Sequence, residues 1–305
     1  MGTGAEFDAI REMIAHWGTR ARGIGDDAAV IDVPRGDRLV ASVDTAVENR
    51  HFRAEWLTPR EISYRAVAAA LSDLAAMAAR PLGVLVAMTV PERWRDRLPQ
   101  LADGIGDALD IVGTTIRGGN LSDGSELSIT TTVFGSAFAP LRRAGAKPGE
   151  HVYVTGALGA PATALRRFGE GKSPDEYRER FARPMPRIAE AIWLADRGAS
   201  AAIDVSDGLV ADVAHLATAS GVCIELDASR VPRFSDVAVE TALVGAEEYE
   251  LVIAAAMELD VDEFAQRFSL RLTRIGAVTP TIAGRPVVVH GAKIDDVRGY
   301  DHFSR

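Results

Sequence analysis

Four aspartates stand in apolar or glycine-rich surroundings, which is an unusual place for a carboxylate. Asp27 follows the glycine turn of RGIGDDAAV, Asp44 ends the run LVASVD, Asp73 interrupts an alanine-rich stretch, and Asp204 ends AAID. A carboxylate on a core-facing surface is costly unless it is paired or coordinates a cation. Several carboxylates in one cleft would also repel one another, and divalent cations such as Mg²⁺ relieve that repulsion. These positions therefore indicate a metal site that holds a phosphate compound.

Asp73 is the clearest of the four, and it also has the plainest alternative explanation. At helical spacing its neighbours are the apolar residues Ala66, Ala69, Ala70 and Met77. A buried salt bridge to Arg65 or Arg80 would satisfy this carboxylate as well as a cation would. For Asp73 alone, a salt bridge and a bound metal ion explain the carboxylate equally well. The agreement of four sites, each expected at a strand end or a helix start, favours metal.

Ser206 and Asp207 follow Asp204 at the start of a predicted helix, in the sequence IDVSDGLV. Backbone amides at a helix start can bind phosphate, and these side chains could also bind a hydrated cation. The stretch is not an EF-hand loop, because Gly208 and His215 occupy positions where that loop needs oxygen ligands.

Two glycine motifs resemble nucleotide-binding loops but lack the context that such loops require. GIGDDA precedes a predicted strand, whereas a Rossmann loop follows a strand and opens a helix. GKS at residues 171–173 lacks the glycine that a P-loop has five residues earlier, where Arg166 stands. We interpret the first motif as part of the metal–phosphate site and the second as a surface loop.

The composition limits the class of partner and the compartment. The 305 residues include 34 lysines and arginines against 43 aspartates and glutamates, a formal net charge of −9. Nucleic acid or an anionic membrane surface would require a basic stripe, and the arginines are instead scattered. The single cysteine, Cys223, excludes an internal disulfide, and the N-terminal sequence lacks the features of a signal peptide. We therefore expect a cytoplasmic protein without nucleic-acid or membrane partners.

The elements expected to position these residues form two groups along the chain. The first group has helices at residues 5–17, 59–80 and 93–109, and strands at 28–33, 38–44, 82–90 and 127–137. A connector with proline and glycine, APLRRAGAKPGE, then marks a domain boundary between 1–139 and 140–305. The second group has strands at 151–156, 200–205, 222–226, 249–255 and 272–278, and helices near 160–169, 185–198 and 209–219. This order predicts two α+β or α/β domains.

Taken in order, these stretches resemble the thiamine-monophosphate kinase family, part of a superfamily that includes aminoimidazole ribonucleotide synthetase and selenophosphate synthetase. The resemblance is carried by GIGDDAAV, SVD, HF at 51–52, LSDLAAMAARP, RAGAKPGEHVYVTG, AIDVSDGLVADVAHLATASG, EEYEL and RGYDHF. Most of these motifs are weak individually, but their order and spacing are specific and cover the chain almost end to end.

The resemblance implies a two-domain α+β / α/β fold of the synthetase-like kinase type. The N-terminal domain would bind ATP and magnesium and would dimerise, with strands of two subunits closing a barrel in a homodimer. The C-terminal α/β domain would complete the nucleotide and substrate site. The implied activity is ATP- and Mg²⁺-dependent phosphorylation of thiamine monophosphate to thiamine diphosphate. Transfer would be direct and in line, without a protein base.

The resemblance also assigns roles to individual residues by the motif in which each stands. It implies several magnesium ions on the side chains of Asp27, Ser42, Asp44, Asp73, Asn120, Asp204 and Asp207, and on the backbone of Val43. It implies nucleotide contacts by Gly119, Asn120, Arg143 and Ser206. It implies substrate contacts by His51, Glu247 and Tyr300. Without the resemblance, His51 as a surface histidine and Tyr300 as a packed tail residue are the simpler interpretations.

Two positions depart from the usual pattern of the family. Asn120 stands where the family has a metal-binding aspartate, and a neutral oxygen binds a cation more weakly; Asp123 could compensate. Ala246 stands where the family has glycine and restricts the backbone, while Glu248 keeps an acidic charge. The open alternatives are another ATP-dependent synthetase or kinase of the superfamily, and a nucleotide-binding protein with reduced turnover because of Asn120. Selenophosphate synthesis is disfavoured, because the N-terminal region has no reactive cysteine or lysine.

Overall fold

The computed structural model describes residues 4–282 and 284–294, and the chain divides into two compact units. Unit 1 comprises Met1–Leu74 and Ala79–Pro140, and unit 2 comprises Ala75–Ala78 and Leu141–Arg305. Within the described residues, no helix combines the length and apolar character that crossing a bilayer requires.

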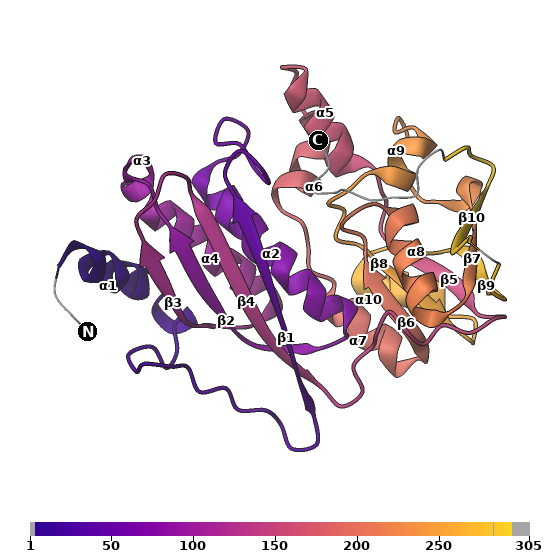
Figure 1. Cartoon of the computed structure of the whole chain (residues 1–305), viewed down its shortest axis with the longest axis horizontal. Helices are drawn as coiled ribbons and strands as arrows, with labels where there is room; N and C mark the ends of the chain where they lie inside the picture. The colour runs from indigo at the N-terminus through magenta and orange to yellow at the C-terminus, as the bar shows by residue number, and fades with distance from the viewer. Residues whose placement is uncertain (1–3, 283, 295–305) are drawn as a thin grey trace. The chain divides into compact units, whose positions relative to one another are not determined.

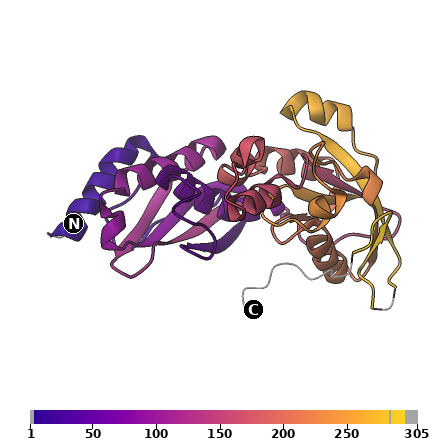
Figure 2. The same cartoon turned by 90° about the horizontal axis from the view of Figure 1, so that it is seen from above.

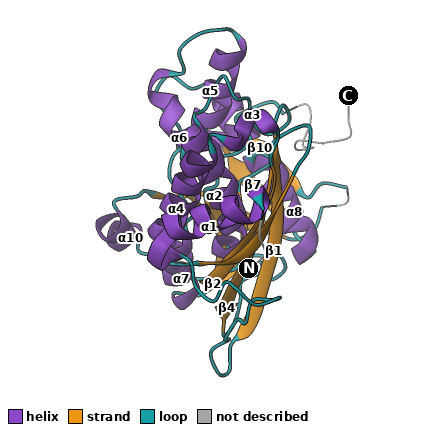
Figure 3. Ribbon diagram, turned by 90° about the vertical axis from the view of Figure 1, so that its left-hand side faces the viewer, coloured by secondary structure: helices purple, strands orange, loops and turns teal. Residues whose placement is uncertain are grey.

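Unit 1 is a four-stranded sheet with helices along one face (Figures 2 and 3). Its strands are β1 (Arg38–Val47), β2 (Arg80–Thr89), β3 (Ile116–Ser122) and β4 (Ser128–Ala137), in the order β1-β4-β2-β3. Strands β2 and β3 are parallel, and the other pairs are antiparallel. The helices are α1 (Ala5–Trp17), α2 (Pro59–Ala76), α3 (Glu92–Arg95) and α4 (Leu98–Val112), with the 3₁₀ turn η1 (Gly18–Arg20).

Alternation along the strands decides which side chains of unit 1 meet the helices. Successive residues of a strand point to opposite faces, so every second residue of β2 and β4 is buried. The buried set consists of Val84, Val86, Met88, Ile129, Thr131 and Val133. We call their side of the sheet the helix-covered face and the opposite side the open face.

One strand predicted for unit 1 is wrong, and one strand of unit 1 was missed. Residues 28–33 form an irregular loop rather than a strand, and Val30 is 73% exposed, so this apolar run has no buried face. Strand β3 was not predicted, because its glycines and lack of alternation conceal it. A Cβ atom on Gly119 would lie 1.9 Å from the carbonyl oxygen of Val86, so glycine permits this close strand pairing.

Unit 2 contains a six-stranded mixed sheet in the order β10-β7-β9-β5-β8-β6 (Figure 1). The strands are β5 (His151–Thr155), β6 (Ala199–Asp204), β7 (Cys223–Asp227), β8 (Leu251–Ala255), β9 (Leu272–Thr279) and β10 (Val287–His290). The helices are α5 (Ala160–Gly169), α6 (Arg178–Ala182), α7 (Ile188–Asp196), α8 (Leu209–Ser220), α9 (Val239–Val244) and α10 (Val261–Phe268), with the 3₁₀ turns η2 (Asp175–Tyr177) and η3 (Ala228–Arg230).

Helix α8 packs against β6, β7 and β10, and its apolar residues join the core of the sheet. Cys223 is fully buried in β7. Asp204 ends β6 as expected, whereas Asp44 lies inside β1, which continues to Val47. The predicted two-domain α/β architecture is confirmed at this level.

Candidate active site

Ser42, Asp44 and Asp73 share the helix-covered face of unit 1. In the register of β1 with β4, Ser42 lies opposite Val133 and Asp44 opposite Thr131, both of which are fully buried. Helix α2 brings Asp73 to the same face, where the Ser42 hydroxyl donates a hydrogen bond to Asp73 Oδ2 over 2.5 Å. Asp73 is half-buried and Asp44 is exposed. Three predicted metal ligands thus occur on one surface.

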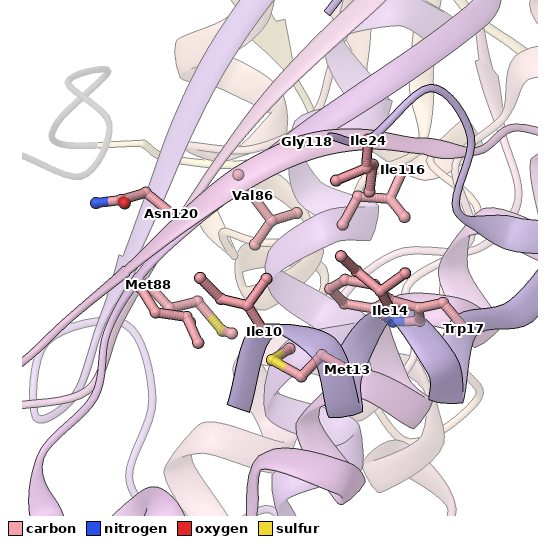
Figure 4. A pocket seen from close by; sticks show the side chains of 12 residues that line it. Ile10, Met13, Ile14, Trp17, Ile24, Val86, Met88, Ile116, Gly118 and Asn120 are labelled. Atoms are coloured by element: carbon pink, nitrogen blue, oxygen red, sulfur yellow. The ribbon is translucent and has the colours of Figure 1, made fainter. Parts of the chain in front are cut away.

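Asn120 lies on the open face instead. The registers define two adjacent rows across the sheet: Thr45, Thr130, Ala87 and Asn120; then Asp44, Thr131, Val86 and Gly119. Because neighbouring residues of a strand point to opposite faces, Asn120 and Asp44 point away from each other. Figure 4 shows the Asn120 amide directed away from Val86, Met88 and the side chains of α1. The structure does not bring Asn120 to the Asp44–Asp73 surface of its own chain.

Asp27 and Asn120 line a common pocket of about 370 Å³. The loop of residues 23–29 contributes Asp26 and Asp27, and β3 contributes Gly119 and Asn120. Arg117 also lines this pocket, and its guanidinium donates to the carbonyl oxygen of Val30 over 2.7 Å, which ties down the loop. The pocket therefore gathers three predicted site residues beside a cation that sequence reasoning missed.

His51 lies in the turn that follows β1, three residues after the buried Glu48. Glu48 accepts hydrogen bonds from Arg93 Nη2 at 2.7 Å and from the backbone N–H of Leu127 at 3.0 Å. The Nδ1 atom of His51 accepts the backbone N–H of Val47 at 3.1 Å. In the neutral imidazole this bond places the proton on Nε2.

In unit 2, a tight turn between β6 and α8 carries Asp204, Ser206 and Asp207. Asp204 is 5% exposed, whereas Ser206 and Asp207 are half-buried. Asp212, in the first turn of α8, accepts the backbone N–H groups of Ser206, Asp207 and Gly208 at 3.0, 3.0 and 3.1 Å. These three bonds hold the turn that presents the predicted metal and nucleotide residues.

Asp212 is a candidate functional residue that sequence reasoning missed. The sequence pattern that could have indicated it is an aspartate four residues after Gly208, where the carboxylate can accept backbone N–H groups at the start of a helix. Burial, followed by the negative charges of Asp204 and Asp207, raises the pKa of Asp212 to about 8. A bound cation would relieve this repulsion. Among the described residues, no three His, Cys, Asp or Glu side chains form a group arranged to hold a metal.

The segment from residue 245 to residue 250 folds back onto this turn. The backbone N–H of Glu247 donates to the Ser206 carbonyl at 2.7 Å, and that of Tyr249 donates to the Val205 carbonyl at 2.9 Å. Glu247 and Tyr249 have φ values of 67° and 52°, in the left-handed region that L-residues disfavour. Ala246 is not among the described residues with positive φ, so the restriction expected from its methyl group has no effect here.

Glu250 anchors the end of this segment. It is fully buried and accepts hydrogen bonds from Arg187 Nη2 at 2.6 Å, Arg180 Nη2 at 2.6 Å and Thr155 Oγ1 at 2.6 Å. Burial alone would raise the pKa of Glu250, but the guanidiniums of Arg187 and Arg180 outweigh burial and lower it. The carboxylate is therefore ionised and fixes β8 to the neighbouring helices.

Glu248 is also buried, but its carboxylate accepts fewer hydrogen bonds than that of Glu250 does. One oxygen accepts the backbone N–H of Gly159 at 2.5 Å, at the start of α5. The other oxygen, Oε2, is buried and has no hydrogen-bond partner among the described residues. Burial raises the pKa of Glu248 to about 8. The EEYEL motif points to these glutamates, but their partners are distant in sequence and could not be predicted.

Three predicted site residues remain to be placed. Val43 is exposed on the open face of β1. Arg143 is exposed in the connector, where its carbonyl oxygen accepts the Ser220 hydroxyl at 2.9 Å. Tyr300 and the RGYDHF motif lie outside the described residues.

Comparisons with known proteins agree with this architecture. Residues 25–137 match the family AIR synthase related protein, N-terminal domain, and residues 147–288 match AIR synthase related protein, C-terminal domain. The chain is 35% identical to the thiamine-monophosphate kinase of Escherichia coli (strain K12) over 305 residues, which covers 92% of each chain.

Solved structures of other proteins are also similar to this chain over nearly its whole length. The crystal structure of thiamine-monophosphate kinase from Stenotrophomonas maltophilia K279a has a TM-score of 0.84 and 34% identity, and the match covers 94% of this chain and 97% of that one. The structure of AaThiL complexed with AMPPCP and TMP has a TM-score of 0.77 and 27% identity, with 97% and 96% covered.

Proposed function

The chain belongs to the thiamine-monophosphate kinase family of AIR synthase related proteins, and from this we propose that it phosphorylates thiamine monophosphate with ATP. The terminal phosphoryl group of ATP would pass to the substrate phosphate and form thiamine diphosphate and ADP. The complex of AaThiL with AMPPCP and TMP supports this pairing of substrates.

The observation that carries the proposal is the packing of Glu247 on the 204–207 turn. One hydrogen bond, from Glu247 N–H to the Ser206 carbonyl, holds a predicted substrate residue against predicted nucleotide and metal residues. Phosphoryl transfer depends mainly on positioning and charge neutralisation and needs no strong protein base. A rigid turn of carboxylates and amides can position phosphate groups and can hold the cations that neutralise their charge.

Magnesium fits the donor chemistry of these residues. Asp204 and Asp207 at the turn, and Ser42, Asp44 and Asp73 on the helix-covered face, supply the oxygen ligands that Mg²⁺ prefers. Burial and the neighbouring charges of Asp204 and Asp207 raise the pKa of Asp212, and a cation bound at this turn would oppose that rise. Bound magnesium would neutralise the phosphate charge, and phosphate oxygens would complete each ligand set. Asp27, Asn120 and the backbone of Val43 would contribute further oxygens.

The residues of this chain have separate positioning roles. Ser206, Gly119, Asn120 and Arg143 would contact the nucleotide. Glu247, held in its left-handed conformation, would face the positive charge of thiamine, and His51 would contact the same substrate with its Nε2–H. Tyr300 would stack on the heteroaromatic ring.

We further propose that the open face of unit 1 packs against a second copy and closes a barrel. Leu39 and Val43 on β1 are 53% and 62% exposed, and apolar side chains of this kind at a sheet face favour burial in an interface. Sedimentation analysis tests this: Val43→Asp should shift a dimer to monomer, and an unchanged sedimentation coefficient would contradict it. The cytoplasmic location stays a prediction.

The activity is tested by incubating the protein with ATP, Mg²⁺ and thiamine monophosphate and separating the products by chromatography. We expect thiamine diphosphate and ADP in equal amounts, and neither product when the metal is chelated. A folded protein that binds ATP but makes no thiamine diphosphate would refute the proposal. ADP formed only with a different phosphate acceptor would instead indicate another enzyme of the superfamily.

A further inference from the structure

A polar pocket of about 270 Å³ in unit 2 contains three arginines and none of the residues discussed above. Its polar side chains are Ser229, Arg230, Arg233, Ser235, Arg271 and Thr273. The segment around η3 supplies the first four, and the start of β9 supplies the last two. We call this site the arginine pocket.

Within the described part of the chain, few acceptors pair with the guanidiniums of the arginine pocket. The side chain of Arg271 makes no hydrogen bond or ion pair with any described residue, and that of Arg233 uses only Nε, which donates to the Val237 carbonyl at 3.0 Å. Arg230 approaches Asp227 at 3.8 Å, and both side chains are about half exposed, so this contact contributes little. Asp227 is already the acceptor for the backbone N–H and hydroxyl of Ser229. In a chain with a net charge of −9, three guanidiniums facing one pocket make a local positive site that favours an anion.

Thr273 gives a second, independent indication of a ligand. Its Oγ1 atom is buried and has no hydrogen-bond partner among the described residues. Burying a hydroxyl without a partner is unfavourable, and most such groups in folded proteins are satisfied. Thr273 also lines the arginine pocket, so a small side-chain rotation would let this hydroxyl donate to a ligand oxygen there.

The pocket is separate from the predicted catalytic turn. Strands β6, β8, β5 and β9 are successive neighbours, so Asp204 on β6 and Thr273 on β9 are three strand spacings apart, roughly 14 Å. The three guanidiniums would also repel the cationic ring of thiamine. The ligand is therefore neither the phosphate acceptor beside Asp204 nor the ring system of the proposed substrate.

We propose that the arginine pocket binds a phosphate group, either as a free anion or as the end of a phosphomonoester. The planar guanidinium donates two parallel hydrogen bonds to phosphate oxygens, a geometry that lysine cannot supply. The volume lies just below the roughly 300–1,000 Å³ typical of pockets for larger ligands, and it suits one or two phosphoryl groups.

Calorimetric titration tests the proposal with the full chain, in chloride buffer of constant ionic strength and without divalent metal. The probes are inorganic phosphate, inorganic diphosphate and glycerol 3-phosphate. We expect one equivalent to bind, and Arg271→Gln to weaken binding about tenfold through the loss of charge-assisted hydrogen bonds. Thr273→Val, which replaces the hydroxyl by a methyl group of similar size, should weaken it less. Equal affinity for phosphate and glycerol 3-phosphate would identify a phosphomonoester, and preference for the free anions would identify phosphate or diphosphate.

Two control variants locate the binding. Arg267→Gln on α10 removes the same charge from an exposed arginine outside the pocket, and Asp204→Asn alters the predicted metal site. Both should bind the probes as the unmodified chain does. No binding by the unmodified chain, equal affinity in Arg271→Gln, or loss in Asp204→Asn would each overturn the proposal. Circular dichroism would establish that Arg271→Gln is folded.

Discussion

The hydroxyl of Ser42 on β1 donates to the carboxylate of Asp73 on α2 over 2.5 Å, and so joins a strand and a helix through two predicted metal ligands. The bond holds one Asp73 oxygen in a defined orientation. A ligand carboxylate that is oriented in this way binds a cation without first losing rotational freedom.

We expect Ser42→Ala to raise the Mg²⁺ concentration needed for half-maximal turnover by at least about tenfold, because the variant loses a predicted ligand oxygen and also the hydrogen bond that orients Asp73. Titration of the rate with Mg²⁺ measures the effect. Ser42→Thr retains the hydroxyl and should behave nearly as the unmodified chain does. An unchanged Mg²⁺ requirement in Ser42→Ala would show that this hydroxyl has no role in cation binding.

Asp44→Ala and Asp204→Ala should each reduce turnover by more than about 100-fold, because direct ligands contribute more than the residues that orient them. Asp44 is exposed, so its variant should keep the melting temperature of the unmodified chain. Steady-state assays with thermal unfolding as a control measure both effects. Full activity in either variant would contradict the metal assignment of that residue.

Asn120→Asp should strengthen metal binding by adding a negative charge to the pocket that already contains Asp26 and Asp27. We expect higher activity, or half-maximal activity at lower Mg²⁺. Without metal, the added repulsion should lower the melting temperature slightly. Identical Mg²⁺ dependence in the two proteins would show that residue 120 does not contact the cation.

Glu247 occupies a left-handed backbone conformation with φ of 67°, which glycine adopts without strain. Glu247→Gly should therefore be more stable than Glu247→Ala by about 1 kcal/mol, as measured by urea unfolding. Both variants lose the carboxylate, so both should show a raised KM for thiamine monophosphate. A KM equal to that of the unmodified chain would refute the substrate role of Glu247.

Glu248 should make stability depend on pH. Its pKa in the folded chain is about 8, above the usual 4.5, so between these values the folded state holds a proton that the unfolded chain has released. This contribution is complete below pH 4.5 and is lost as pH rises through 8. The melting temperature should fall between pH 5 and pH 8, and Glu248→Gln should reduce the fall. Parallel curves for the two proteins would contradict a proton on Glu248.

The sequence alone determined the local features of this protein. The strand that ends at Asp204 and the helix that begins at Leu209 follow from apolar periodicity and a glycine at the turn, which act over a few residues. The burial of Cys223 follows from its apolar neighbours. The order of the motifs was enough to identify the family, because it needs no knowledge of which segments touch.

The tertiary structure decided which of these residues meet. Asp44 and Asn120 lie on opposite faces of one sheet because strand register, a long-range pairing, sets the direction of each side chain. Strand β3 forms although its sequence lacks alternation, because Gly119 allows close approach to Val86. The burial of Asp212 and the ionisation of Glu250 depend on surroundings that folding creates, and the arginine pocket joins Arg233 to Arg271, which α9, β8 and α10 separate in sequence. Burial and charge compensation are properties of these long-range contacts, so composition and periodicity could not reveal them.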